Sequence, residues 1–269
     1  MHIRKSLNTI LSIVRQKNTC VSSILIACLF LFSCSATQGT IPPIIEESPV
    51  DSTLVWKLFL EQYPSERLPY KMKLSSKLHI HGITRRFTIF TLGNAQGLVK
   101  MDILTSGIHV AKIAQNPIDS LFYIPSMRKA YITKTNNAKD VEVLVGFSLP
   151  LSLDSLCALL SGNASFVFSS YTTVIPRNGL LEFILPDNSQ LFLSYNGSIV
   201  KWQNTYGWQL IPIYSVEGKQ RGFTAILESK KYTMEYIVDS LEDIGYIEPS
   251  DFYLQLPPNT DIYTIKESK

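Results

Sequence analysis

The chain has 269 residues, 45% of them hydrophobic and 17% charged, and its formal net charge is +3. Four of its 25 Lys and Arg residues lie within residues 1–33, which contain no Asp or Glu, so the rest of the chain is close to neutral. This balance excludes an extensive basic surface of the kind that attracts nucleic acid. The length is sufficient for one large folded domain with an ample core.

Residues 1–33 have the pattern of a secretory signal peptide. A basic segment that ends at Lys17 precedes the short apolar run VSSILIACLFLF (residues 21–32), and this order is typical of export signals. A transmembrane anchor, the alternative, requires about 20 apolar residues. The run is too short for that, so we predict a cleaved signal peptide.

The apolar run ends at Leu31-Phe32-Ser33-Cys34, which is followed by polar residues. This stretch resembles the bacterial lipobox, whose last residue is a lipidated cysteine. Leu25-Ile26-Ala27-Cys28 fits the pattern better letter by letter, but cleavage before Cys28 would leave the apolar residues LFLFS at the new terminus. We therefore predict that Cys34 is lipidated, for example with palmitate; an ordinary secreted protein is the alternative. Cys157, the one other cysteine after Cys34, is expected to be a buried apolar residue.

Residues 34–50 contain three prolines and little periodicity, which predicts a flexible tether between the lipid anchor and a folded body. A helix is expected next, because Asp51 or Ser52 can cap an N-terminus and Pro64 ends the segment. Its apolar residues recur at helical spacing and form one stripe, which must lie against another part of the protein: Trp56, Phe59, Leu60 and Tyr63.

From Lys77 to the C-terminus most of the sequence alternates between apolar and polar residues, which is typical of antiparallel strands with one buried face. The clearest apolar rows are Leu78 and Ile80, Phe87 and Ile89, and Val99, Met101 and Ile103. Further strands are predicted near residues 108–114, 121–124, 141–145, 180–185, 190–195, 199–203, 208–213, 222–228, 232–238 and 261–265. Turn signals separate the strands: Gly93-Asn94, Ser106-Gly107, Asn136-Asn137, Asp187-Asn188, Asn196-Gly197 and Glu217-Gly218.

A second helix interrupts the strands. Ser152 can cap the segment from Leu153 to Ser161, and Gly162 supplies a C-terminal stop. The apolar stripe of this helix consists of Leu153, Leu156, Cys157 and Leu160. Two amphipathic helices and many antiparallel strands predict an α+β fold, in which a large curved antiparallel sheet carries the helices on its concave face.

The order of several segments indicates a family. The N-terminal helix is followed by LHIHGITRRFTIF, VKMDILTSGIHVAKI, SLFYIPSMRKAYI and VGFSLPLSLDSLCALLSGN, and the chain ends with FYLQLPPNTDIYTI. The most characteristic piece is Gly146 to Leu151 together with the second helix. In this order the segments resemble the bacterial lipoprotein-carrier superfamily, the LolA/LolB-like proteins, over residues 51–265. The N-terminal lipobox points to the outer-membrane lipoprotein receptor, LolB, rather than to the soluble carrier, LolA.

The resemblance implies an unclosed β-barrel with a helical lid, and an apolar cavity that receives the acyl chains of lipoproteins or lipids. Residues 51–269 would form this lipid-binding domain. The implied lid residues are Trp56, Phe59, Leu60, Leu153, Leu156 and Leu160. The implied cavity-lining residues are Leu78, Ile80, Phe87, Ile89, Val99, Met101, Ile103, Val110, Ile184, Leu191, Leu193, Phe223 and Leu227.

The resemblance also implies a place and partners. The protein would be anchored in the outer membrane through the Cys34 lipid, face the periplasm, receive cargo from a periplasmic carrier protein and act as a chaperone for it. In the receptor, an apolar side chain on a loop helps to deliver lipid into the membrane. The corresponding turn here contains Leu104 and Ser106, with Ser106 at the place of the bulky apolar residue, so Leu104 is the candidate for that role. No cofactor, metal or enzymatic activity is implied.

Two other function classes stay open: a structural lipoprotein that scaffolds an envelope assembly and has no lipid cavity, and a hydrolase with scattered catalytic residues. No GxSxG, HExxH, CxxC or phosphate-binding glycine-rich motif is present. His79 and His81, with His109, could in principle hold a metal ion. No carboxylate or cysteine accompanies them at ligand spacing, so we expect His79 and His81 to be solvated on the convex face of the sheet.

Overall fold

The computed structural model describes residues 50–134 and 149–265, and Asp51–Lys269 form one compact unit. Several predictions lie outside the described residues. They are the signal peptide, Cys34, the tether, the Asn136-Asn137 turn and the strand at 141–145. Gly146 to Ser148 of the characteristic segment also lie outside.

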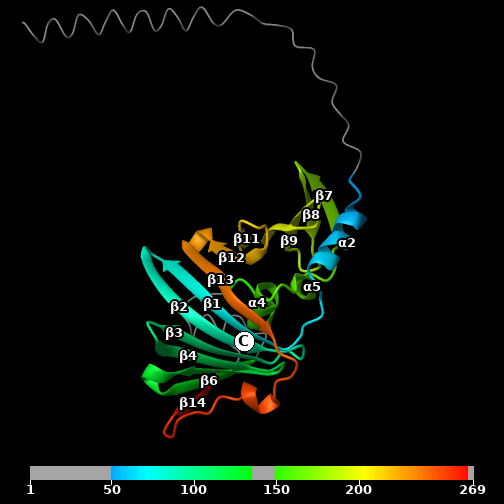
Figure 1. Ribbon diagram of the computed structural model, residues 1–269. Coiled ribbons are helices and arrows are strands. Elements are labelled where there is room, and N and C mark those ends of the chain that lie inside the picture. The colour runs from blue at the N-terminus through cyan, green and yellow to red at the C-terminus, as the bar shows by residue number, and fades with distance from the viewer. Residues whose placement is uncertain (1–49, 135–148, 266–269) are drawn as a thin grey trace, which may run out of the picture. The chain divides into compact units, whose positions relative to one another are not determined.

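The described residues contain fourteen strands in one sheet (Figure 1). In spatial order the strands run β14-β6-β5-β4-β3-β2-β1-β13-β12-β11-β10-β9-β8-β7. The end strands β14 and β7 do not pair with each other, so the curved sheet is unclosed, as predicted. The strand bounds are β1 (Tyr70–Ile80), β2 (Ile83–Gly93), β3 (Val99–Thr105), β4 (Ile108–Gln115), β5 (Asp119–Ile124), β6 (Lys129–Lys134), β7 (Thr173–Arg177), β8 (Leu180–Ile184), β9 (Gln190–Ser194), β10 (Ile199–Gln203), β11 (Trp208–Tyr214), β12 (Gln220–Leu227), β13 (Tyr232–Asp243) and β14 (Asp261–Thr264).

The sheet consists of two antiparallel meanders, β1 to β6 and β7 to β13, which are joined where β1 pairs with β13. The sequence predicts a purely antiparallel sheet, and this prediction is wrong for one pair of strands. β14 pairs in parallel with β6, from Asp261 opposite Lys129 to Thr264 opposite Ile132. A parallel neighbour requires a long crossover, which the chain supplies because β14 follows the whole second meander.

Two strands were not predicted from the sequence. β6 follows a one-turn 3-10 helix, η1 (Pro125–Met127), after which Arg128 takes the left-handed conformation at φ 51°. Gly and Asn adopt that conformation most readily. Because the hairpin has Arg at this position, its sequence lacks the residues by which a turn is usually predicted. β7 contains Pro176 and lies at the edge of the described sheet. Proline lacks an N–H group and is tolerated in such an edge strand.

Within the described residues, three α-helices accompany the sheet: α2 (Ser52–Gln62), α4 (Leu153–Leu160) and the single turn α5 (Ala164–Val167). The predicted caps are confirmed. Asp51 accepts hydrogen bonds from the Thr53 and Leu54 N–H groups, and Ser152 accepts one from Ser155 N. No helix within the described residues combines the length and the apolar character needed to cross a bilayer.

Candidate functional site: an apolar cavity between the sheet and α4

A cavity of about 640 Å³ lies between the first meander, β13 and α4. The inward rows of β1 and β2 form one wall, because side chains alternate between the two faces of a strand. Leu149, Leu151 and α4 form the opposite wall. Ten residues that the sequence assigned to the cavity or to its lid line this space: Leu78, Ile80, Phe87, Ile89, Met101, Ile103, Val110, Leu153, Leu156 and Leu160.

Six residues that the sequence assigned to the lining do not border this cavity: Val99, Ile184, Leu191, Leu193, Phe223 and Leu227. Ile184, Leu191 and Leu193 belong to β8 and β9, where α2 contacts β9. Phe223 and Leu227 are buried in β12, a strand that contacts α4. Val99 shares the inward row of Met101 but is fully buried at the start of β3. Val99, Leu191, Leu193, Phe223 and Leu227 therefore belong to filled parts of the core, whereas Ile184 is only half-buried at the end of β8.

Of the two helices that were expected to form the lid, α4 borders the cavity and α2 does not. Trp56 and Phe59 are buried, with the Trp56 ring 5.0 Å from that of Phe183 on β8 and 4.7 Å from that of Tyr171. Leu60 is 40% exposed, which the stripe did not predict. The backbone of α2 also approaches Gly197 in the β9–β10 turn, where an added Cβ would lie 2.6 Å from Phe59 N. α2 thus covers the second meander rather than the cavity.

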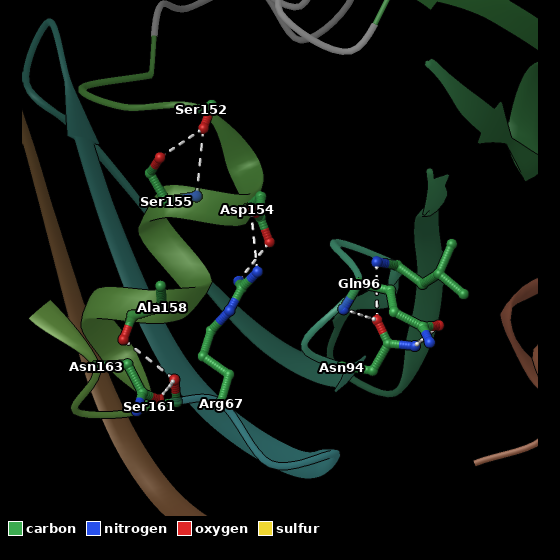
Figure 2. Close-up of polar contacts among 10 residues, drawn as sticks. Arg67, Asn94, Gln96, Ser152, Asp154, Ser155, Ala158, Ser161 and Asn163 are labelled. Carbon is green, nitrogen blue, oxygen red and sulfur yellow. Dashed lines mark hydrogen bonds and ion pairs between the residues drawn. The ribbon is translucent and has the colours of Figure 1, made fainter. Parts of the chain in front are cut away.

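Hydrogen bonds and one ion pair hold both ends of α4 (Figure 2). At its N-terminus, Ser155 N donates to Ser152 Oγ over 3.2 Å, and Arg67 Nη1 donates to Asp154 Oδ1 over 2.6 Å. The Arg67 side chain is only 3% exposed, and its guanidinium lies 3.8 Å above the ring of Phe166. The segment between α2 and β1 is thereby fastened to the helix that covers the cavity.

The C-terminal end of α4 is fastened to the same segment. Ser161 Oγ donates to Asn163 Oδ1 over 2.9 Å, and Asn163 Nδ2 donates to the carbonyl oxygen of Glu66 over 2.7 Å. The Ser161 contact is drawn in Figure 2. Because Glu66 precedes Arg67, one short stretch of chain contacts the helix at both ends. This double attachment fixes α4 as a wall of the cavity.

The β2–β3 turn lies beside the N-terminus of α4. Asn94 Oδ1 accepts hydrogen bonds from Gln96 N and Leu98 N, each over 3.0 Å, which closes the turn (Figure 2). An added Cβ on Gly97, whose φ is +75°, would lie 3.9 Å from Asp154 Oδ2. The turn is thus in van der Waals range of the helix that covers the cavity.

The interior of the cavity is almost entirely apolar. Its few polar lining groups include Ser76 and Tyr236, which face each other across β1 and β13. Burial raises the pKa of Tyr236 well above its ordinary value, so this phenol stays neutral. Its hydroxyl is buried and has no hydrogen-bond partner among the described residues.

Cys157 is fully buried on α4, as expected for an apolar residue. Burial raises the pKa of its thiol to about 12. Because the thiolate is the reactive form of cysteine, this thiol is not activated as a nucleophile. The neighbourhood of the cavity thus offers apolar surface rather than a catalytic thiolate.

The histidines separate at the β1–β2 turn. His79 points to the outer face, where its Nδ1 lies 3.0 Å from Thr84 Oγ1. β1 ends at Ile80, and His81 takes the left-handed conformation at φ 48°. His81 borders the cavity, which His79 does not, and it also shares a shallow hollow outside the cavity with His79. The expectation that both lie on the convex face is therefore wrong for His81. No group of three or more potential metal-binding side chains occurs within residues 50–134 and 149–265.

The predicted delivery loop is the β3–β4 turn. Ser106 and Gly107 both have positive φ, 49° and 79°, which is the backbone of a two-residue type I′ turn. The β1–β2 turn has the same pair of positive φ angles at His81 and Gly82, so this backbone does not by itself require a small residue at Ser106. Leu104 is half-buried, whereas Ile108, on the other side of the turn, is 69% exposed.

The fold and the site together define a curved, unclosed sheet whose concave face and one covering helix enclose an apolar cavity. No protein-family model matches the chain, and no curated protein matches it in sequence. Solved structures of similar fold include a LolA superfamily protein from Nitrosomonas europaea, at 9% identity and a TM-score of 0.46 over 77% of this chain and 98% of that one.

Two further solved structures are similar to this chain. A domain named for outer-membrane lipoprotein sorting, from Vibrio parahaemolyticus, has 13% identity and a TM-score of 0.43 over 74% of this chain and 94% of that one. A DUF1329 family protein from Desulfovibrio piger has 9% identity and a TM-score of 0.44, covering 77% and 98%. Identities this low transfer no function, so the function is argued from the cavity itself.

Proposed function

We propose that this protein is an envelope lipoprotein that binds acyl chains of lipoproteins or lipids in the cavity and helps to transfer them into the outer membrane. The observation that carries the proposal is the cavity. Its volume of about 640 Å³ lies within the range of small-molecule sites, and its lining is dominated by Leu, Ile, Phe and Met side chains. A scaffolding protein would need a filled core at this place instead.

The lining suits a hydrocarbon ligand on energetic grounds. Transfer of an acyl chain from water to an apolar site contributes roughly 0.8 kcal/mol for each buried methylene group. A cavity with little polar surface can therefore hold a fatty chain without a cofactor or a charged catalyst. The wall formed by α4 is a single short helix that contacts at both ends hold in place. The route that we propose for entry of the chain is movement of this helix after those contacts open.

The proposed membrane anchor is the lipid on Cys34, with residues 34–50 as the tether. We expect that Cys34→Ala abolishes lipidation. The variant should then either keep its signal peptide or be found without a membrane anchor. The measurement is incorporation of radiolabelled palmitate, followed by membrane fractionation of the mature protein. Labelling of the variant at the parent level would contradict the assignment and would point to Cys28.

The cavity is tested by Met101→Gln. Met101 is buried in the cavity wall, and an amide there would lie against the acyl chain without a hydrogen-bond partner. Such a group costs about 1–3 kcal/mol, so we expect the affinity for a fluorescent fatty acid to fall by about tenfold. Fluorescence titration measures the affinity, and thermal unfolding verifies that the variant is folded.

The matched control is Met127→Gln. Met127 is 51% exposed and does not border the cavity, so the same chemical change there should leave the affinity unchanged. A folded Met101→Gln protein that binds the probe as tightly as the parent would argue against acyl binding in this cavity.

A further inference from the structure

One cation breaks the apolar row that β2 presents to the cavity. Ile83, Phe87 and Ile89 line the cavity, and Arg85 occupies the position between Ile83 and Phe87 in the same row. Arg85 is paired with Leu78 of β1, which is buried and points inward. Directly paired residues of antiparallel strands place their side chains on the same face, so the guanidinium belongs to the concave side.

Arg85 lies at the mouth of the cavity rather than in its depth. The row of β2 passes from exposed Ile83 and Arg85, through half-buried Phe87, to buried Ile89. His81, in the adjoining turn, borders the same mouth and also a shallow polar hollow lined by Lys231 and Glu228. The cavity is therefore apolar at its inner end and carries a cation where it meets solvent.

This positive charge has no partner within the described part of the structure. None of the described residues that line the cavity is an Asp or a Glu, and no ion pair of Arg85 occurs among residues 50–134 and 149–265. A guanidinium presents a planar fork of donors that suits the two oxygens of a carboxylate or a phosphate. The mouth thus offers a group that an anionic ligand can engage.

We propose that the preferred ligand is an anionic amphiphile, with its acyl chain in the cavity and its carboxylate or phosphate against Arg85. This inference rests on the proposed acyl binding and adds the class of head group. It also makes a distinction, because an acyl chain joined through a neutral ester or amide gains nothing from Arg85. A fatty acid and a lysophospholipid share the required chemistry, namely one chain next to a compact negative charge.

Arg86 provides a matched control that the chain itself supplies. It is the next residue, is equally cationic and exposed, and does not border the cavity. Its partner on β1 is Lys77, which is exposed on the outer face. Arg85→Gln and Arg86→Gln therefore change the net charge identically and differ in the face from which the charge is removed.

The experiment measures the affinities of the parent, Arg85→Gln, Arg86→Gln and Arg85→Lys by isothermal titration calorimetry. The probes share a palmitoyl chain: palmitate, palmitoyl-lysophosphatidylglycerol and neutral monopalmitoylglycerol, each below its micelle concentration. We expect Arg85→Gln to weaken both anionic probes by about tenfold and the neutral probe by less than twofold. Arg86→Gln should change none of them by more than twofold, and Arg85→Lys should fall between the parent and Arg85→Gln.

The outcomes separate this inference from the proposed function. Equal losses in Arg85→Gln and Arg86→Gln, or equal losses for neutral and anionic probes, overturn the head-group assignment and leave acyl binding intact. Failure of the parent to bind any of the three probes overturns both. Dependence on Arg85 for palmitate alone identifies a fatty acid as the source of the anion, and dependence for the lysophospholipid alone identifies a phosphate.

Discussion

Asp154→Ala is expected to lower the free energy of unfolding by about 3 kcal/mol, because it leaves the buried Arg67 guanidinium without its counter-charge. Breaking a buried ion pair by removing one partner costs about 3–5 kcal/mol, and the Arg67 side chain is only 3% exposed. For a domain of this size the loss corresponds to a fall in Tm of roughly 10 °C. Urea unfolding followed by circular dichroism measures the change.

Asp119→Ala is the control for this prediction. Asp119 also pairs with a cation, at 3.0 Å from Lys134 Nζ, but both side chains are largely exposed, at 43% and 62%. Such pairs contribute at most about 1 kcal/mol. The double variant Arg67→Met/Asp154→Leu should recover most of the lost stability, since an apolar pair replaces the ionic one. An Asp154→Ala protein as stable as Asp119→Ala would refute the importance assigned to the buried pair.

Gly222→Ala is expected to have an effect of similar size, through the backbone rather than through charge. Gly222 on β12 lies opposite Ile237 of β13, and an added Cβ would overlap the carbonyl oxygen of Tyr236. Backbone atoms of a paired strand cannot rotate away as a side chain can, so β12 and β13 would have to separate locally. We expect a loss of about 3 kcal/mol or more in the free energy of unfolding.

The comparison for Gly222 is Gly245→Ala. An added Cβ at Gly245 meets no atom within 4 Å, and this glycine is not in the left-handed conformation. Its substitution should stay within about 0.5 kcal/mol of the parent. Equal denaturation midpoints for the two alanine variants would show that β12 can shift without cost and would contradict the prediction. Because Tyr236 borders the cavity, Gly222→Ala should also weaken binding of the fluorescent fatty acid.

The sequence predicted the two clear helices, their capping residues and most strands, because each depends on residues close together in the chain. Asp51 and Ser152 cap the helices through neighbouring N–H groups, and alternation marks which side chains share a face of a strand. β6 was not predicted because the turn before it depends on Arg128 in the left-handed conformation, which arginine rarely adopts.

The cavity could be predicted only in part, since alternation does not reveal what lies against a buried face. Leu191 and Leu193 have the same pattern as Leu78 and Ile80, yet β9 lies against α2 while β1 borders empty space. Arg85 was missed because a polar residue in an apolar row looks like an interruption of the strand. The role that we propose for Arg85 follows from its position at the mouth of the cavity, and that position is known only from the fold.

The junction between β1 and β13 determines the order in which the sheet can be completed. Each meander forms from hairpins between neighbouring segments, but Tyr70 pairs with Asp243 across most of the folded chain. Closing so long a loop is entropically costly and slow, so we expect this seam to form after the hairpins of each meander. Until then the edge of β1 is open to other chains. Its outward lysines, Lys71, Lys73 and Lys77, are expected to repel another copy of the same edge and so to disfavour aggregation of the half-folded protein.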